Sequence, residues 1–209
     1  MRIIAHRGLW STPNEKNSLR AIKRAISAGF GIEVDLRDYR GKIVLSHDIP
    51  LGGEPTFDKF VDLLQSMMPP DPPVPLAFNV KSDGLCTQLS EYKNVLSGLD
   101  YFVFDMSVPD MRSYVDSSIS VFTRFSDIEP LPVLLDYTDG VWCDSFSDDG
   151  YSLDNYRKFL VQGKRICVVS PELHRRDHVP VWEKIADLCE SKDFLLCTDF
   201  PEEAAIFFK

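Results

Sequence analysis

The chain has 209 residues, of which 44% are hydrophobic and 26% are charged, and its formal net charge is −9. These values are typical of one globular domain, and an acidic chain without a Lys/Arg block is not expected to bind nucleic acid or an anionic membrane surface. No apolar run approaches the length of a membrane span, and five cysteines without zinc-type spacing predict free thiols in a reducing compartment, the cytoplasm.

Short β-type runs alternate with helical patterns along the whole chain. The expected strands are 2–6, 31–37, 76–82, 101–105, 120–124, 141–145, 165–170 and 194–198, with a further extended piece at 42–47. The expected helices are 17–29, 57–67, 85–96, 108–115, 153–161, 181–189 and 202–207. A proline-rich segment at 68–75 predicts a stiff extended connector.

Strands that alternate with helices predict a parallel sheet, and eight such units predict closure into a (β/α)8 TIM barrel. We therefore expect the α/β class, with residues 1–209 forming a single compact barrel domain. Because the chain is close to the lower end of barrel lengths, several helices must be short. The segment 126–136 contains two prolines and leaves little room for a helix.

The expected strand at 31–37 carries the most informative pattern. Side chains alternate across a strand, so Glu33 and Asp35 share one face while apolar residues take the other. Two inward carboxylates repel each other unless a cation neutralises them. A hard divalent ion, Mg²⁺ or Ca²⁺, is suited to such oxygen ligands. A surface strand with a solvated polar face is the alternative for the same pattern.

The expected strand at 76–82 places Asn79 and Lys81 on one face. The Asn79 amide oxygen would bind the metal, and Lys81 would bind a phosphate as a point charge. A salt bridge from Lys81 to a carboxylate of the preceding strand is an alternative that does not exclude this role. Asp105 and Asp144 lie near the carboxyl ends of their strands. Barrel enzymes place reactive groups there, although ordinary loop caps occur at the same positions.

Two histidines, His6 and His47, end the first strand and the extended piece at 42–47, so both are expected at the C-terminal face of the barrel. Two imidazoles that titrate near neutrality can divide the roles of base and acid on a phosphodiester. Arg7 can bind the non-bridging oxygens of the phosphate as a planar fork. Together these residues predict metal-assisted cleavage of a small-molecule phosphodiester.

Several short motifs, in this order along the chain, resemble the glycerophosphodiester phosphodiesterase family. They are Ile4-Ala5-His6-Arg7-Gly8, Glu15-Lys16-Asn17-Ser18-Leu19, Gly31-Ile32-Glu33-Val34-Asp35 and Ser46-His47-Asp48, with Asn79-Val80-Lys81 and Thr198-Asp199-Phe200-Pro201 fitting the same pattern. The resemblance implies a phosphoric diester hydrolase on a phospholipase-C-like (β/α)8 barrel that uses a divalent ion. It implies His6 and His47 as the acid/base pair, Arg7 and Lys81 as phosphate ligands, and Glu33, Asp35 and Asn79 at the metal.

The chain departs from the family pattern at two positions. Lys16 stands where the family usually has an acid, next to Asn17, which would contact the metal or its water. Asn79 stands where the family has a third carboxylate, and an uncharged amide coordinates a metal more weakly. These departures indicate a divergent branch, for which a sugar- or glycan-linked phosphodiester is one candidate substrate.

Residues after the third strand would set the choice of substrate, with Arg124, Asp144, Glu172 and His174 as candidates. His174 and His178 lie in a polar loop, where solvent exposure explains them equally well. Asn79 also motivates a second hypothesis, a barrel that binds a phosphorylated ligand without turnover. A third interpretation keeps the enzyme but lets a hydroxyl of the substrate attack phosphorus, so that a cyclic phosphate is the product.

Overall fold

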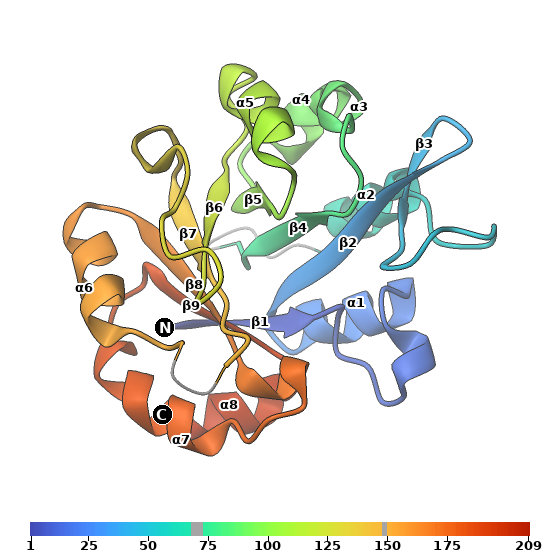
Figure 1. Ribbon diagram of the computed structural model, residues 1–209. Helices are drawn as coiled ribbons and strands as arrows, with labels where there is room; N and C mark the ends of the chain where they lie inside the picture. Colours follow the sequence, from blue (N-terminus) through green and yellow to red (C-terminus); the bar gives the residue numbers. More distant parts are fainter. Residues whose placement is uncertain (68–72, 148–149) are drawn as a thin grey trace. The chain divides into compact units, whose positions relative to one another are not determined.

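The structure is a computed structural model that describes residues 1–67, 73–147 and 150–209 (Figure 1). The chain forms two compact units, named here the N-unit, which is Ala5–Ser120, and the C-unit, which is Met1–Ile4 with Val121–Lys209. The expectation of one barrel domain stays a prediction. Most of the expected proline-rich connector, residues 68–72, lies outside the described part of the chain.

The N-unit is built from parallel strands and short helices. Its strands are the end of β1 (Arg2–His6), β2 (Gly31–Tyr39), β3 (Lys42–Leu45), β4 (Leu76–Val80) and β5 (Tyr101–Phe104). Its helices are η1 (Pro13–Glu15), α1 (Leu19–Ser27), α2 (Phe57–Met67), α3 (Cys86–Glu91), α4 (Lys93–Leu96) and α5 (Val108–Asp116). Strand β4 pairs in parallel with both β2 and β5, whereas β3 is antiparallel to β2. The single helix expected at 85–96 is divided into α3 and α4.

The C-unit repeats the parallel pattern. Its strands are β6 (Phe122–Phe125), β7 (Gly140–Cys143), β8 (Arg165–Val169) and β9 (Phe194–Thr198), each paired in parallel with the next. Its helices are η2 (Leu135–Tyr137), α6 (Leu153–Val161), η3 (Pro171–His174), α7 (Val179–Ile185), η4 (Ala186–Leu188) and α8 (Pro201–Phe207). Between β6 and β7 the only helical segment among the described residues is η2, as the prolines of this segment predicted.

The order of elements confirms the predicted fold class. Counting β1, the described residues contain eight strands that are each followed by a helical segment, while β3 is the additional strand expected at 42–47. This is the α/β arrangement of a (β/α)8 barrel, with short helices in several places. No helix in the described parts of the chain is long and apolar enough to cross a bilayer. All five cysteines are described, and none forms a disulfide.

A tight hairpin carries one of the predicted catalytic residues towards β2. Arg40 and Gly41 connect β2 to β3 with φ angles of 49° and 75°, the left-handed pair that a two-residue type I′ turn requires. Beyond β3, the backbone N–H of Ser46 donates to the carbonyl of Asp35 at 3.0 Å. His47 is therefore tied, through its neighbour Ser46, to the part of β2 that carries Asp35.

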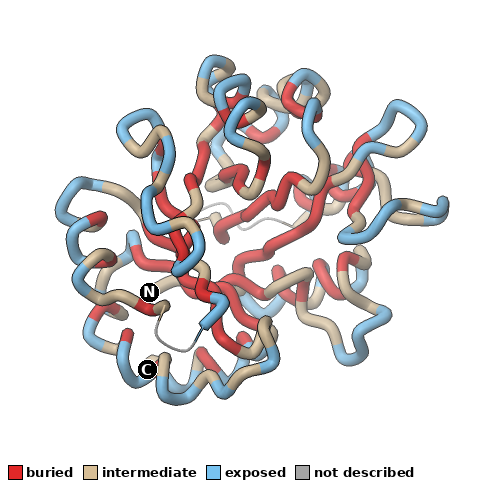
Figure 2. The backbone as a smooth tube through the Cα atoms, in the orientation of Figure 1, coloured by how far each residue is buried: buried red, intermediate tan, exposed pale blue. Residues whose placement is uncertain are grey.

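Burial follows the parallel sheet (Figure 2). The first six residues of β2 are all buried, and every residue of β4 is buried, as expected for strands covered on both faces. Helix α1 is capped at its N-terminus by Ser18, whose hydroxyl accepts from the N–H of Ala21 at 3.2 Å, and the helix buries one side only. Glu33 and Asp35 are therefore enclosed together with the apolar residues of β2.

Candidate active site

Two acidic side chains, Glu33 and Asp35, share one face of β2, and they are only 1% and 0% exposed. The parallel register sets Asp35 directly beside Asn79 of β4, so the amide and the two carboxylates face the same way. The alternative of a solvated surface strand is therefore excluded. Since an ionised carboxylate loses several kcal/mol on burial without partners, the groups around this pair determine its chemistry.

Asp35 is held by groups from three other segments. The Arg7 guanidinium Nε lies 2.8 Å from Asp35 Oδ2, and the Asn17 side-chain amide donates to the same oxygen at 2.7 Å. In return, the Asp35 N–H donates to the Asn17 amide oxygen at 3.2 Å. Lys81 Nζ lies 3.7 Å from Asp35 Oδ1 and 3.3 Å from Asp105 Oδ2. The salt bridge proposed as an alternative role for Lys81 is thus present, and two cations compensate the buried charge of Asp35.

The backbone is strained at three residues whose side chains belong to this cluster. Arg7, Asn17 and Asp105 have φ angles of 59°, 60° and 74°, in the left-handed region that non-glycine residues rarely adopt. The N–H of Asn17 donates to the Arg7 carbonyl at 3.0 Å, which links two of the three. Such strain costs on the order of 1–3 kcal/mol at each residue and is concentrated at functional sites. The cluster around Asp35 is therefore a candidate active site on conformational grounds as well as chemical ones.

Glu33 differs from Asp35 in the groups that surround its carboxyl group and in its pKa. Its Oε2 accepts from the backbone N–H of Arg7 at 3.1 Å and lies 3.9 Å from His6 Nε2. Burial raises the pKa of Glu33 to about 8, and the nearby charge of Asp35 adds to the rise, while the cations Arg7 and Lys81 act against it. The Glu33 carboxyl group therefore holds a proton near neutral pH.

The oxygen atoms of this cluster fit a hard divalent cation. Asp35 Oδ1 and Asn79 Oδ1 are buried and accept no hydrogen bond from any described residue, and the Glu33 carboxyl group lies on the same face. Oxygen atoms of this kind are the ligands that Mg²⁺ and Ca²⁺ prefer. Among the described residues no three His, Cys, Asp or Glu side chains are grouped so as to hold a metal. The candidate ligands are therefore two carboxyl groups and one amide.

The two histidines have different surroundings. The His6 side chain is 12% exposed and close to Glu33, whereas the His47 side chain is 46% exposed on the loop after β3. His47 Nδ1 lies 2.9 Å from Asp48 Oδ1, and the Nε–H of Arg37 donates to the His47 carbonyl at 2.9 Å. Both imidazoles belong to the N-unit, as does the cluster around Asp35.

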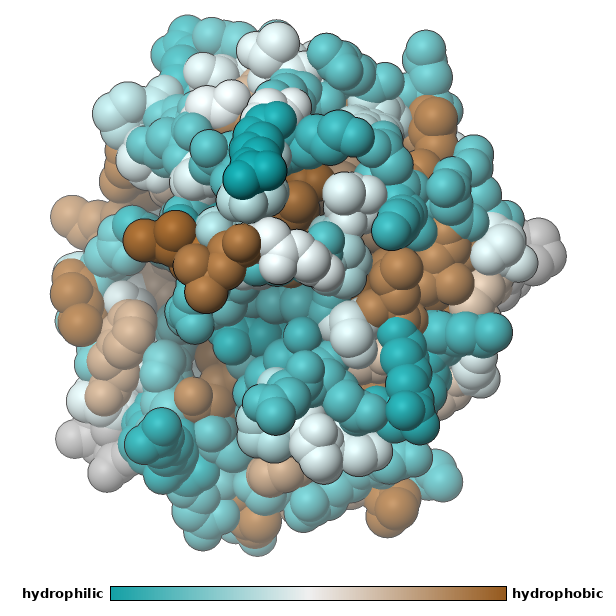
Figure 3. Space-filling view, turned by 90° about the vertical axis from the view of Figure 1, so that its right-hand side faces the viewer, coloured by the Kyte–Doolittle hydropathy of each residue, from teal (hydrophilic) through white to brown (hydrophobic). Residues whose placement is uncertain are grey.

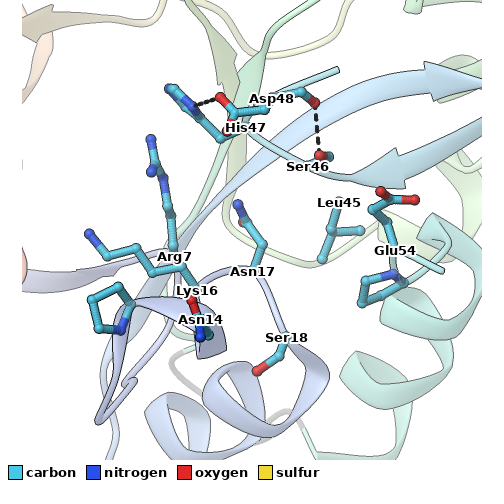
Figure 4. A pocket seen from close by; sticks show the side chains of 12 residues that line it. Arg7, Asn14, Lys16, Asn17, Ser18, Leu45, Ser46, His47, Asp48 and Glu54 are labelled. Atoms are coloured by element: carbon cyan, nitrogen blue, oxygen red, sulfur yellow. Dashed lines mark hydrogen bonds and ion pairs between the residues drawn. The ribbon is translucent and has the colours of Figure 1, made fainter. Parts of the chain in front are cut away.

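A pocket of about 350 Å³ lies beside His47 and is named here the His47 pocket. Its lining includes Arg7, Lys16, Asn17, His47 and Asp48. In Figure 4 the ends of the Arg7 and Lys16 side chains and the His47 ring gather on one side of this pocket. The sequence marked Lys16 only as a departure from a family pattern. The one sequence signal for its position in the pocket wall is that it precedes Asn17, a residue predicted to contact the metal or its water.

The candidates in the C-unit make contacts of their own. Asp144 Oδ1 lies 2.7 Å from His174 Nε2 and also accepts from the N–H of Ser145 at 2.7 Å. The ring of Phe146, which is 52% exposed, packs at 5.0 Å from the His174 ring. The structure thus brings together two of the predicted candidates, Asp144 directly after β7 and His174 at the end of η3.

Glu172 and His178 bind other groups of the C-unit. The Glu172 carboxylate accepts from the Thr198 hydroxyl at 2.5 Å and from the N–H of Asp199 at 3.0 Å, which fastens η3 to the end of β9. His178 Nε2 lies 3.1 Å from a carboxylate oxygen of Glu203, and its side chain is only 13% exposed. Solvent exposure therefore does not explain His178, and the contacts of Glu172 join two elements of the fold.

Comparison with known proteins places the fold. No protein-family model matches the sequence, and no curated protein matches it. Three solved structures are similar over 99–100% of this chain. One is a proposed glycerophosphodiester phosphodiesterase from Galdieria sulphuraria, at 17% identity, TM-score 0.71 and 97% of its own chain. A second is a glycerophosphodiester phosphodiesterase from Agrobacterium tumefaciens, at 16% identity, TM-score 0.68 and 98% of its own chain. The third is a glycerophosphoryl diester phosphodiesterase from Parabacteroides distasonis, at 12% identity, TM-score 0.69 and 85% of its own chain.

The chain shares its fold with these three structures. The similarity extends over 99–100% of this chain and over 85–98% of the three others, so the fold is matched as a unit rather than through one motif. A fold supports many activities, and function has to be argued from the site. In this chain the residues that bear on function are those of the cluster around Asp35 and of the His47 pocket.

Proposed function

We propose that the chain hydrolyses a small-molecule phosphodiester, either glycerophosphodiester-like or linked to a sugar or glycan. The observation that carries this proposal is the buried pair Glu33 and Asp35, held through strained backbone by Arg7 and next to Lys81. A site that concentrates both signs of charge away from water is suited to stabilise a reacting anion. The fold shared with structures described as glycerophosphodiester phosphodiesterases supports the same reaction class.

The two histidines would be the acid/base pair. One imidazole removes a proton from the water whose oxygen attacks phosphorus. The other donates a proton to the alcohol oxygen as its bond to phosphorus breaks, so that the products are a phosphate monoester and an alcohol. In this assignment Glu33 orients the less exposed His6, and Asp48 orients the more exposed His47.

Arg7 and Lys81 would hold the non-bridging oxygens of the phosphate. Both side chains are 18% exposed, so each reaches from the buried carboxylates towards solvent. Asp35 contacts both cations and fixes their positions before the substrate binds, which lowers the cost of organising them during the reaction. Arg7 and His47 both line the His47 pocket, so a phosphate bound by Arg7 would lie in the same pocket as the His47 imidazole.

Glu33, Asp35 and Asn79 would hold a divalent ion, Mg²⁺ or Ca²⁺, and Asn17 would contact the ion or its water. When bound, such an ion would neutralise the negative charge that grows on the phosphoryl oxygens. The two buried oxygens without a donor, Asp35 Oδ1 and Asn79 Oδ1, support this assignment.

The test is turnover of glycerophosphodiesters and of bis-p-nitrophenyl phosphate, with Mg²⁺, with Ca²⁺ and with a chelator. His6→Ala and His47→Ala should each lower kcat at least about 100-fold, while His178→Gln, a histidine in the C-unit, should retain activity if it folds. Circular dichroism shows whether each variant is folded. Equal turnover by wild type and both alanine variants would contradict the assignment of the histidines.

One observation favours a second candidate function, binding without turnover. Asn79 supplies no charge to the metal ligands, and Lys81 lies close to the Asp35 oxygen that a metal would use. Calorimetry that detects a phosphorylated ligand under conditions without any hydrolysis would support this candidate. If turnover is found, phosphorus NMR of the products separates hydrolysis from formation of a cyclic phosphate.

A further inference from the structure

We propose that Arg37 is a positioning residue for His47: its guanidinium group, together with the Tyr39 hydroxyl on the same face of β2, clamps the loop that carries the imidazole. The inference rests on the proposed function and adds a residue to the same site. It comes from the contacts that hold residues 46–55, named here the His47 loop.

The His47 loop runs over the surface of the N-unit. The side chain of Asp48 is 94% exposed, and Ile49 and Leu51 are 76% and 89% exposed. Figure 3 shows the side of the molecule that lies at the right of Figure 1, where β3 is drawn, and hydrophobic side chains stand there among hydrophilic ones. A loop with so few buried side chains depends on its hydrogen bonds for a fixed position.

Arg37 lies on the face of β2 that carries the buried carboxylates. Side chains alternate along a strand, so Glu33, Asp35 and Arg37 point to the same side. Arg37 is partly exposed and pairs with Val44 of β3, three residues before His47. Its Nε–H donates to the His47 carbonyl at 2.9 Å. The strand that supplies the buried carboxylates therefore also fixes the backbone of the residue assigned to proton transfer.

Tyr39, two residues further along β2, holds the loop at a second point. Its hydroxyl group donates to the Leu51 carbonyl at 3.4 Å. The backbone passes close to this hydroxyl, because a Cβ added to Gly52 would lie 3.0 Å from Tyr39 Oη. Glu54 accepts from the N–H groups of Leu51 and Gly52 at 2.8 and 2.9 Å, so this part of the loop is also fixed internally. Because the Tyr39 hydrogen bond is long, we expect it to contribute less than that of Arg37.

The imidazole of His47 has its own partner, which is exposed to solvent. His47 Nδ1 lies 2.9 Å from Asp48 Oδ1, and this hydrogen bond is the main reason that the pKa of Asp48 is lowered. A pair of exposed charged side chains fixes its geometry only weakly, whereas a hydrogen bond from a charged donor to a carbonyl is stronger. The Arg37 contact is therefore the stronger of these two restraints on His47.

The position of the loop affects both the reach and the proton of the imidazole. A shift of about 1 Å in a catalytic group can reduce a rate about 100-fold. An ionised carboxylate only accepts hydrogen bonds, so Asp48 places the proton of the neutral imidazole on Nδ1 and leaves Nε2 for the substrate. Loss of the clamp should therefore lower the rate and also change the tautomer of His47.

The kinetic test compares Arg37→Ala, Arg37→Lys and Tyr39→Phe with wild type on a glycerophosphodiester. Arg37→Ala should lower kcat about 10- to 100-fold and leave KM within about threefold, because the phosphate ligands are unchanged. Arg37→Lys keeps the charge but not the geometry of the donor, so its kcat should lie between those of Arg37→Ala and wild type. Tyr39→Phe should lower kcat by no more than about threefold.

A double-mutant cycle shows whether Arg37 acts through His47. In a His47→Ala background, Arg37→Ala should lower kcat by no more than about threefold. Arg112→Ala is the matched control, because it removes an exposed arginine of α5 that pairs with Asp116 of the same helix, and it should behave as wild type. Equal losses from Arg37→Ala in the wild-type and His47→Ala backgrounds would overturn the inference.

Nuclear magnetic resonance of ¹⁵N-labelled histidine provides a readout that needs no turnover. The two ring nitrogens of His47 report which one carries the proton, and Arg37→Ala should raise the share of the Nε2–H form. The signals of His178, in the C-unit, should not move. An unchanged His47 tautomer in a folded Arg37→Ala variant would refute the inference whether or not wild type is active. If wild type cleaves no phosphodiester but the tautomer changes as expected, the proposed function fails while Arg37 is confirmed as the residue that positions His47.

Discussion

The raised pKa of Glu33 makes a quantitative prediction about stability. Burial and the charge of Asp35 raise the pKa of Glu33 to about 8, from 4.5 for an ordinary glutamate. The folded chain therefore holds this proton more tightly than the unfolded chain. The contribution of Glu33 to the free energy of unfolding is complete below the unfolded pKa and is lost as the pH rises through about 8.

The size of the effect follows from proton linkage. Each pH unit between the two pKa values is worth about 1.4 kcal/mol per proton, so wild type should lose roughly 2–3 kcal/mol between pH 6 and pH 8 from this group alone. Glu33→Gln has a neutral side chain of the same shape at every pH. The variant should therefore match wild type only near the unfolded pKa of about 4.5, be about 2 kcal/mol more stable at pH 6, and gain a further 2–3 kcal/mol over wild type by pH 8.

Urea unfolding in the presence of a chelator, at several values between pH 5.5 and pH 8.5, measures this difference. Glu54→Gln is the control, because Glu54 accepts backbone hydrogen bonds that lower its pKa and is already ionised throughout this range. Its plot of unfolding free energy against pH should run parallel to that of wild type. A Glu33→Gln plot that also runs parallel to wild type would show that Glu33 is ionised in the folded chain and refute the reasoning.

Three further predictions concern the same region. A divalent ion at Glu33 must displace its proton, so Mg²⁺ or Ca²⁺ should bind more tightly as the pH rises from 6 to 8, with proton release that calorimetry in two buffers can count. Gly8→Ala should lower the free energy of unfolding by about 2 kcal/mol or more, because φ is +86° and an added Cβ would lie 2.8 Å from the backbone of Ala21; denaturant unfolding measures it. Ser18→Ala should cost about 1 kcal/mol through loss of the α1 cap, whereas Ser18→Asp should retain it, as thermal unfolding would show.

Much of the site was predictable because strand alternation is a local rule. The spacing of Glu33 and Asp35 placed both carboxylates on one face, and the same rule placed Asn79 and Lys81 together on the next strand. Which of two neighbours Lys81 would contact was not predictable. That choice depends on the register of β2 against β4 and on the position of Asp105, both of which are set by tertiary structure.

Other features depended on contacts far apart in the sequence. The left-handed backbone of Arg7 lets its N–H bind Glu33 and its side chain bind Asp35, and nothing in the surrounding sequence indicates this arrangement. The break between α3 and α4 falls at Tyr92, whose hydroxyl donates to Asp58 of α2 at 2.6 Å. Helical periodicity continues through that break, so the interruption reflects packing rather than local preference.

The formal charges of the buried cluster explain why a phosphodiester needs an additional cation there. Asp35 and Asp105 are balanced by Arg7 and Lys81, and Glu33 is close to neutral because its pKa is about 8. The cluster by itself therefore offers no net positive charge to an anion. A divalent ion that displaced the Glu33 proton would change the formal charge by +1, the value that one phosphodiester group neutralises. Metal and phosphodiester should consequently strengthen each other's binding by the same factor.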